Sequence, residues 1–206
     1  MFTGIINHIA IIESLTKNPD SDLLLSVKFP NKNINHNLDL GCSIACSGIC
    51  LTLIQKHQEE NYFLLNFSVS RETISKTAVL SWYVGAKINI EFSLKIGDEL
   101  GGHMVSGHID GVAVIKSMKK ILDSHEIIFE FPPELKKFIS PKGSIVLNGV
   151  SLTVNQVGDN DFSVNLIKHS FDYTNFHDAK VGDKVNLEID MIARYLNQLL
   201  NKASSI

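Results

Sequence analysis

The chain has 206 residues, 44% of them hydrophobic and 20% charged, a length that suits one large domain or two small ones. A net charge of -3 and a pI near 6.2 argue against binding to nucleic acid or an anionic membrane, since both usually need a basic surface. No stretch approaches the roughly 18 apolar residues of a membrane span, and residues 1–4 lack the basic start of a secretory signal, so we expect a cytoplasmic protein.

An internal repeat with a unit of roughly one hundred residues runs through the chain. The matching pairs are 2–6 with 105–109, 43–52 with 144–153, and 84–91 with 181–188. The spacing between partners shortens steadily along the chain, as small loop deletions would make it, and chance matches would not stay collinear. The sequence therefore predicts a tandem duplication.

In chain order, each unit is predicted to consist of short strands separated by Gly, Pro, Asn and Asp. We expect strands at 23–29, 62–69 and 127–131, two-residue turns at Ser47-Gly48 and Asn148-Gly149, and brief helices near 72–80 and 134–139. About six strands per unit favour a small closed barrel, which leaves no exposed sheet edge. The fold class is all-β, with two tandem homologous six-stranded barrels.

The tail from Met191 has a different pattern. Its apolar residues fall at helical spacing, on one face: Ile192, Tyr195, Leu196, Leu199 and Leu200. This face either packs on the second barrel or mediates association, and periodicity does not separate the two. We divide the chain into a first barrel at 1–102, a second barrel at 103–190, and a C-terminal helix at 191–206 that serves oligomerisation.

Three cysteines, Cys42, Cys46 and Cys50, have the spacing C-x3-C-x3-C. An odd number in a chain without a signal peptide argues against a disulfide framework. An iron–sulfur motif would need a last interval one residue shorter. We therefore expect no metal site, but small buried side chains and one thiol in a pocket.

Five segments in the same order resemble the riboflavin synthase family of tandem lumazine-binding β-barrels. They are the opening Met-Phe-Thr-Gly-Ile, 41–52, 101–109, 149–153 and 186–190. Together they span nearly the whole chain, from Met1 to about Asp190. One such motif would be weak, whereas five in register are specific.

The resemblance implies a homotrimer, held partly by the C-terminal helix, with each active site between the first barrel of one subunit and the second barrel of its neighbour. It implies the last step of riboflavin biosynthesis, a dismutation without cofactor or metal. One 6,7-dimethyl-8-ribityllumazine donates a four-carbon unit to another, which yields riboflavin and 5-amino-6-(D-ribitylamino)uracil. Orienting two substrates can lower a barrier by roughly 7–11 kcal/mol. Which barrel holds the donor, which group is the initiating nucleophile, and whether lumazine synthase associates stay open.

Positions at which the repeats differ are the most informative for chemistry. His108 replaces Ile5 and suits proton transfer near neutral pH, although a hydrogen-bonded pocket histidine is the alternative. Cys50 corresponds to Ser151, where small buried polar packing is the alternative. With the resemblance, the predicted catalytic residues are Ser43, Cys50, His108, Ser151 and Asp190. Asp190 either pairs with His108 or is an N-terminal helix residue.

The resemblance also implies substrate-binding residues. In the first repeat they are Gly4, Ile5, Ile6, Cys50, Leu51, Thr52, Ser68, Val69, Ser70, Arg71, Glu72 and Thr73. In the second repeat they are Gly107, His108, Ile109, Lys142, Ser151, Leu152, Thr153, Ile167, Lys168, His169, Ser170, Phe171 and Asp172. Lys142 replaces Gly41, and an exposed lysine is its alternative.

One position departs from the family pattern. The family has Glu-Thr in both barrels, which Glu72-Thr73 keeps, whereas the second repeat has His169-Ser170. Ser170 preserves a hydroxyl, but His169 cannot mimic a carboxylate acceptor, so ligand binding in the second barrel is left open.

The rival function is a non-catalytic antenna protein of the same fold that binds lumazine or flavin. Such a protein keeps the pocket without needing the reactive groups, all of which are present here. A flavin-reductase-like enzyme would need a nicotinamide site, and no G-x-G-x-x-G follows a strand.

Overall fold

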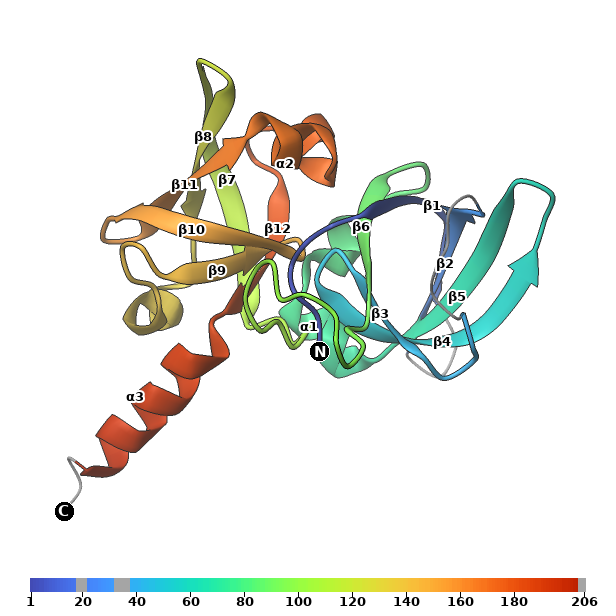
Figure 1. Cartoon of the computed structure of the whole chain (residues 1–206), viewed down its shortest axis with the longest axis horizontal. Helices are drawn as coiled ribbons and strands as arrows, with labels where there is room; N and C mark the ends of the chain where they lie inside the picture. The colour runs from blue at the N-terminus through green and yellow to red at the C-terminus, as the bar shows by residue number, and fades with distance from the viewer. Residues whose placement is uncertain (18–21, 32–37, 204–206) are drawn as a thin grey trace.

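The computed structural model describes residues 1–17, 22–31 and 38–203, which form two closed barrels and a projecting helix (Figure 1). The first barrel contains β1 (His8–Lys17), β2 (Leu23–Pro30), β3 (Ser43–Cys46), β4 (Ile49–Gln58), β5 (Tyr62–Val69) and β6 (Lys87–Phe92). Around the barrel these strands follow the order β1-β2-β5-β4-β3-β6.

The second barrel repeats this arrangement with strands β7 (Gly111–Ile121), β8 (Ser124–Glu130), β9 (Ser144–Leu147), β10 (Val150–Val157), β11 (Asp161–Ile167) and β12 (Lys184–Ile189). Its closed order, β10-β11-β8-β7-β12-β9, is the same circle as in the first barrel. The predicted fold class, two homologous six-stranded barrels from a tandem duplication, is confirmed.

Two-residue turns join β3 to β4 and β9 to β10, as predicted. Ser47 and Gly48 have φ values of 43° and 84°, and Asn148 and Gly149 have values of 47° and 83°. Two successive residues with positive φ match the right-handed twist of the flanking strands. The two turns meet between the barrels, where a Cβ on Gly149 would lie 2.8 Å from the backbone nitrogen of Gly48.

The short helices are more broken than the sequence predicted. The expected helix at 72–80 is α1 (Arg71–Lys76) followed by the 3-10 helix η1 (Ala78–Ser81). Thr77 separates them because its backbone is extended, while its hydroxyl donates to the Thr73 carbonyl and accepts from the Val79 N–H. The expected helix at 134–139 is the 3-10 helix η2 (Pro133–Phe138).

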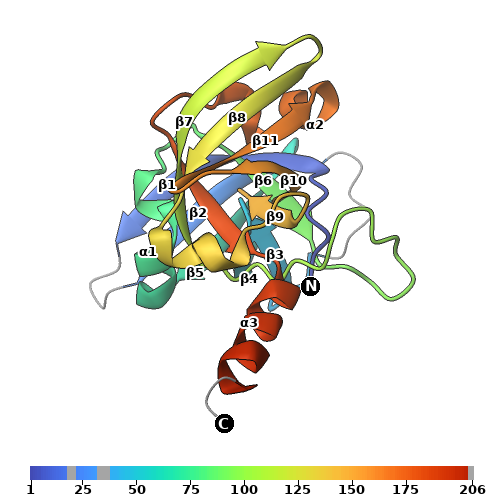
Figure 2. The same ribbon diagram turned by 90° about the vertical axis from the view of Figure 1, so that its left-hand side faces the viewer.

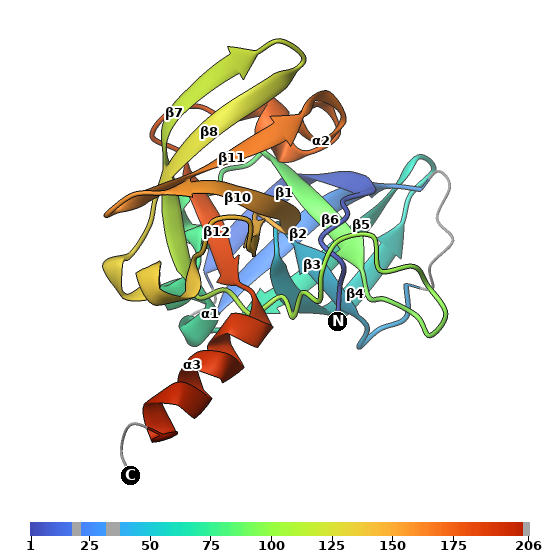
Figure 3. The same cartoon turned by 60° about the vertical axis from the view of Figure 1, so that its left-hand side comes forward.

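Helix α3 (Met191–Ala203) projects away from both barrels in every view (Figures 1, 2 and 3). Its base is held by an ion pair of 2.7 Å between Arg194 and Asp110. The five residues of its apolar face stay 53–67% exposed, so within one chain this face does not pack on the second barrel. Residues 204–206 of the predicted helical tail lie outside the described part of the chain, and no helix within that part is long and apolar enough to cross a membrane.

Two buried asparagines form hydrogen bonds that join the two barrels. Asn186 on β12 donates to the carbonyl of Ser47 over 2.9 Å and accepts from the N–H of Ala78 over 2.7 Å, so it reaches into the first barrel. Asn89 on β6 reaches the other way and donates to the carbonyl of Asn148 over 2.8 Å. Both side chains are fully buried, and their hydrogen bonds satisfy polar groups of the opposite barrel.

Candidate active sites between the barrels

The segments that precede the barrels, 1–7 and 103–110, lie side by side between them. Phe2 and Val105 form an antiparallel bridge with N–H to carbonyl distances of 2.8 and 3.0 Å. Both side chains are buried in a small apolar cluster of their own. This bridge fixes the point from which each segment runs onto the barrel of the other repeat.

Beyond the bridge, each segment contacts the barrel of the other repeat, and we call this crossing the exchange of segments. The carbonyl of Gly4 accepts from the Ser151 N–H over 2.8 Å, and that of Gly107 accepts from the Cys50 N–H over 2.9 Å. Each glycine has a positive φ, and a Cβ on either one would lie 2.6 Å from the facing side chain. Only glycine fits these positions, so each candidate site combines residues of both repeats.

The first site is a pocket of about 210 Å³ on the first barrel. It is lined by Ile49, Cys50, Glu72, Thr73, Lys76, Thr77, Gly107, His108 and Ile109. Six of these residues were predicted as site residues from the sequence. The structure therefore brings the Cys50 thiol and the His108 ring into one cavity, although they are far apart in the chain.

Helix α1 contributes Glu72, Thr73 and Lys76 to this pocket, and a side-chain cap fixes where the helix begins. The Ser70 hydroxyl accepts from the Thr73 N–H over 3.2 Å and lies 3.0 Å from the Thr73 hydroxyl. Other predicted binding residues serve the barrel: Leu51 and Val69 lie in the core, and Ser68 donates to Asp22 on the surface over 3.5 Å. Thr52 is exposed, and Arg71 lines a separate groove.

The second site centres on Ser151, whose hydroxyl lies 2.7 Å from Nδ1 of His103. Burial lowers the pKa of His103, and the charge of Asp190 opposes this effect. Nε2 of His103 is buried without a hydrogen-bond partner among the described residues. A neutral imidazole on a hydroxyl is an arrangement that can move a proton.

His103 was not predicted as a site residue, although it lies within the segment that carries the family resemblance. The signal used to select candidates was a difference between the repeats. His103 has no counterpart in the first repeat, because at the spacing that relates 2–6 to 105–109 its partner would precede Met1. Only its place next to the predicted Ser151, visible in the folded chain, identifies it.

Asp190 has a structural role in this chain. Its Oδ1 accepts from the Ile192 N–H over 2.8 Å, which caps α3. Its charge raises the pKa of His103, whereas His108 lines the pocket on the first barrel. The predicted N-terminal helix position is observed, and a catalytic role of Asp190 stays a prediction.

The stretch Ile167–Asp172 forms the end of β11 and α2 (Lys168–Asp172), the counterpart of α1. Here the side chains contact one another: Lys168 pairs with Asp172, and the His169 ring stacks on Tyr173 at 4.6 Å. Phe171 stacks on His125 at 3.7 Å. In contrast to α1, no side chain caps α2, so the departure at 169–170 accompanies a different helix start.

Several predicted residues lie outside the first pocket. Ser43 begins β3, and its carbonyl accepts from the Ser93 hydroxyl over 2.8 Å. Lys142 is exposed in a turn with φ of 68°, the same left-handed conformation as its counterpart Gly41. Leu152 belongs to the second core, and Thr153 is exposed beside it. The cysteines also separate, because Cys46 is buried in the first core, where burial raises its thiol pKa.

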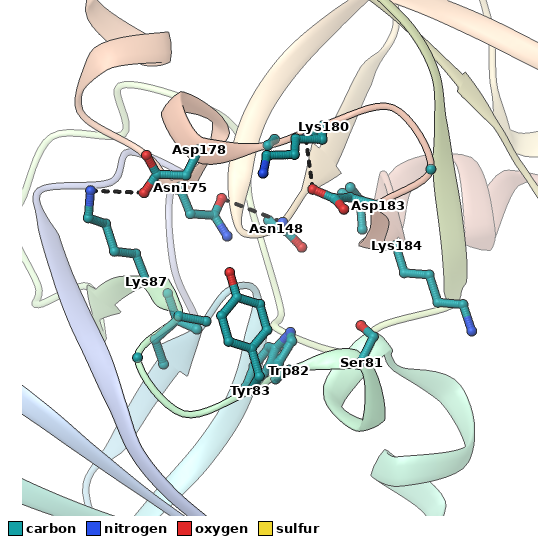
Figure 4. A pocket seen from close by; sticks show the side chains of 16 residues that line it. Ser81, Trp82, Tyr83, Lys87, Asn148, Asn175, Asp178, Lys180, Asp183 and Lys184 are labelled. Atoms are coloured by element: carbon teal, nitrogen blue, oxygen red, sulfur yellow. Dashed lines mark hydrogen bonds and ion pairs between the residues drawn. The ribbon is translucent and has the colours of Figure 1, made fainter.

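A second cleft between the barrels, of about 560 Å³, contains none of the predicted site residues among those that line it (Figure 4). It contains one ion pair, between Lys87 and Asp178 at 2.8 Å, and Asp183 accepts from the backbone N–H of Lys180 over 2.8 Å. Tyr83 points into it from η1's C-terminal side. Cys50, His108 and Ser151 lie instead at the two sites described above.

Residues 3–93 and 106–190 each match the lumazine binding domain, so the match covers most of the chain and both barrels. The chain belongs to the lumazine-binding domain family. Among its relatives, the riboflavin synthase of Brucella abortus (strain 2308) is 43% identical over 202 residues, which cover 97% of this chain and 98% of that protein. The riboflavin synthase of Bacillus subtilis (strain 168) is 36% identical, with 99% and 92% covered.

Solved structures of the family agree with this fold. LumP complexed with 6,7-dimethyl-8-(1'-D-ribityl) lumazine superimposes with a TM-score of 0.81 at 26% identity, over 92% of this chain and 99% of that one. LumP complexed with riboflavin gives a TM-score of 0.83 at 27% identity, over 92% and 100%. The likeness over nearly the whole of both chains shows that this chain and LumP share the arrangement of two barrels.

Proposed function

We propose that this protein is a riboflavin synthase, a transferase that converts two molecules of 6,7-dimethyl-8-ribityllumazine into riboflavin and 5-amino-6-(D-ribitylamino)uracil. The observation that carries the proposal is the exchange of segments, which builds two related sites with different reactive groups. One site combines Cys50 with His108, and the other combines Ser151 with His103. Two related sites suit two identical substrates, and the differences between them suit two different roles.

The chemistry needs one lumazine to lose a proton from its 7-methyl group and the other to be activated by a nucleophile. We assign the proton removal to His108, which lines the first pocket. In the tautomer with the proton on Nε2, Nδ1 of His103 accepts the proton of the Ser151 hydroxyl, which activates that hydroxyl or a water beside it. The protons return to the nitrogens of the departing 5-amino-6-(D-ribitylamino)uracil as its bonds to the four transferred carbons break, and the added nucleophile leaves as the hydroxyl or water.

We also propose a homotrimer in the cytoplasm, with 1–102, 103–190 and 191–206 as its two barrels and its association helix. The support is the apolar face of α3, whose five residues are 53–67% exposed in the single chain. Association would then place the first site of one subunit against the second site of another. Binding to lumazine synthase is a separate question for co-sedimentation.

The test is to incubate the purified protein with 6,7-dimethyl-8-ribityllumazine alone and follow lumazine and riboflavin by absorbance and fluorescence. Riboflavin formed at half the rate of lumazine loss, without added metal or nucleotide, is the expected result. Saturable lumazine binding without turnover would contradict the enzyme and leave a lumazine-binding protein. A variant with His108→Ala should bind lumazine but turn it over more slowly by about 10²-fold or more.

A further inference from the structure

Two buried glutamates hold the exchanged segments, and the reaction described above does not use either of them. Glu188 on β12 is 1% exposed, and its carboxylate accepts three hydrogen bonds from the second segment. These come from the Ser106 N–H at 2.7 Å, the Ser106 hydroxyl at 2.6 Å, and the Gly107 N–H at 2.9 Å. The next residue is His108.

Glu91 on β6 is the counterpart in the first repeat. It accepts from the Thr3 N–H at 2.6 Å, the Thr3 hydroxyl at 2.8 Å, and the Gly4 N–H at 3.0 Å. The next residue here is Ile5. The same device therefore holds both segments, and the difference lies in the side chain that each segment delivers: a titratable ring from one, an aliphatic group from the other.

Holding a backbone segment with a buried carboxylate costs free energy, because the carboxylate loses its hydration. Burial raises the pKa of Glu188, and the hydrogen bonds from Ser106 and Gly107 work against that rise. Desolvating a carboxylate costs free energy unless several donors replace its water, and three donors are the number found here. An ionised carboxylate accepts all three bonds at once, which a neutral amide cannot do.

The segment is fixed from both sides at the point where it reaches the pocket. Glu188 binds the N–H of Gly107, and the carbonyl of the same Gly107 accepts from the Cys50 N–H over 2.9 Å. His108 follows directly and lines the same cavity as Cys50. A shift of the segment would therefore move the His108 ring relative to the Cys50 thiol.

We propose that Glu188 is a positioning residue for riboflavin formation, which acts by holding Ser106 and Gly107 so that His108 stays at the Cys50 pocket. The inference rests on the proposed function and deepens it. Glu91 makes the same contacts to a segment that delivers Ile5, so it supports substrate binding at the second site and does not act through His108. This difference separates positioning from general support of the fold.

The test is a pair of double-mutant cycles on the full chain, with riboflavin formation as the readout. Glu188→Gln should lower kcat about 10- to 100-fold while KM changes less than about threefold, since small misplacement of a reacting group has costs of this size. In the His108→Ala background the same change should cost less than about threefold, because the group it positions is gone. Glu91→Gln should mainly raise KM, by the same factor in either background.

Milder variants keep the test decisive if either glutamine variant fails to fold. Ser106→Ala and Thr3→Ala each remove a hydroxyl that donates to the glutamate and accepts from the backbone N–H two residues further on, and they leave the buried carboxylate in place. Ser106→Ala should lower kcat through His108, and Thr3→Ala should not. Additive losses of Glu188→Gln and His108→Ala, or equal kcat losses for the Ser106 and Thr3 variants, would overturn the proposal. An unmutated protein that forms no riboflavin would instead contradict the proposed function.

Discussion

His103 and Ser151 are the two polar side chains whose contact only the folded chain reveals. Their hydroxyl-to-Nδ1 distance is 2.7 Å, and the partly buried ring has no second partner among the described residues. A histidine held neutral in this way is suited to accept a proton at physiological pH. The contact therefore has consequences for activity and for the acid sensitivity of the fold.

Removing the hydroxyl tests the activity directly. Ser151→Ala should lower the kcat of riboflavin formation by about 10²- to 10⁴-fold, the range of general acid–base and nucleophile losses. Lumazine binding at the first pocket should persist, because Ser151 does not line it. A kcat within about threefold of the unmutated value would remove Ser151 and His103 from the mechanism.

The pKa of His103 is lowered, so protonating it costs more in the folded chain than in the unfolded one. The stability it contributes is present above the ordinary histidine pKa of about 6.5 and is lost as the pH falls through the lower folded value. In His103→Asn the amide still reaches the Ser151 hydroxyl but does not titrate. The fall in Tm between about pH 7.5 and pH 5 should therefore be smaller for this variant than for the unmutated protein. Parallel Tm curves would show that His103 does not titrate with folding.

At the scale of elements, the turns show how close the two repeats approach. Gly149→Ala should destabilise the protein by about 1–2 kcal/mol through its left-handed backbone. The same substitution should destabilise the protein by about 1–3 kcal/mol more, because the new Cβ would meet the Gly48 backbone. Gly182→Ala is the matched control, since Gly182 has φ of 93° but a Cβ added there would meet nothing within 4 Å. Urea denaturation should show the larger loss of unfolding free energy for Gly149→Ala. Equal losses would mean that the Gly48 backbone moves aside without a measurable cost.

Helix α3 carries a second prediction at this scale. Leu199 is 64% exposed in the single chain, so Leu199→Glu should leave the barrels folded and dissociate the proposed homotrimer. Gln198→Glu adds the same charge at an exposed polar position and should leave the trimer intact. Light scattering gives the mass, and circular dichroism checks the fold. A trimer that survives Leu199→Glu would place the interface elsewhere.

For the whole molecule, the asparagine pair couples the barrels. Asn186→Ala would leave the Ser47 carbonyl and the Ala78 N–H buried without their partner, at a cost of about 2–4 kcal/mol. Trp82, the only tryptophan, reports on the first barrel, whereas circular dichroism reports on both. The two urea curves should coincide in the unmutated protein and separate in the variant. Coincident curves in both would show that the barrels are coupled by other contacts.

Sequence reasoning predicted the features that each repeat carries within itself. The barrels, the turns at Ser47 and Asn148, and the helical tail all follow from local periodicity and from the repeat. The exchange of the segments 1–7 and 103–110 did not follow, because a repeat shows what each unit contains but not which barrel receives its first residues. The contact of Ser151 with His103 lies within the second repeat but joins residues that are 48 positions apart, so it too required the fold.

The reciprocal glycine contact also bears on how such a chain arose. Gly48 and Gly149 approach one another backbone to backbone, and each segment accepts a hydrogen bond from the barrel of the other repeat. Two copies of a one-repeat chain would make each of these contacts twice across a twofold axis, as an isologous dimer does. The tandem chain holds both halves of such a dimer in one polypeptide. Its two halves can therefore differ in sequence, as they do where one segment has His108 and the other has Ile5.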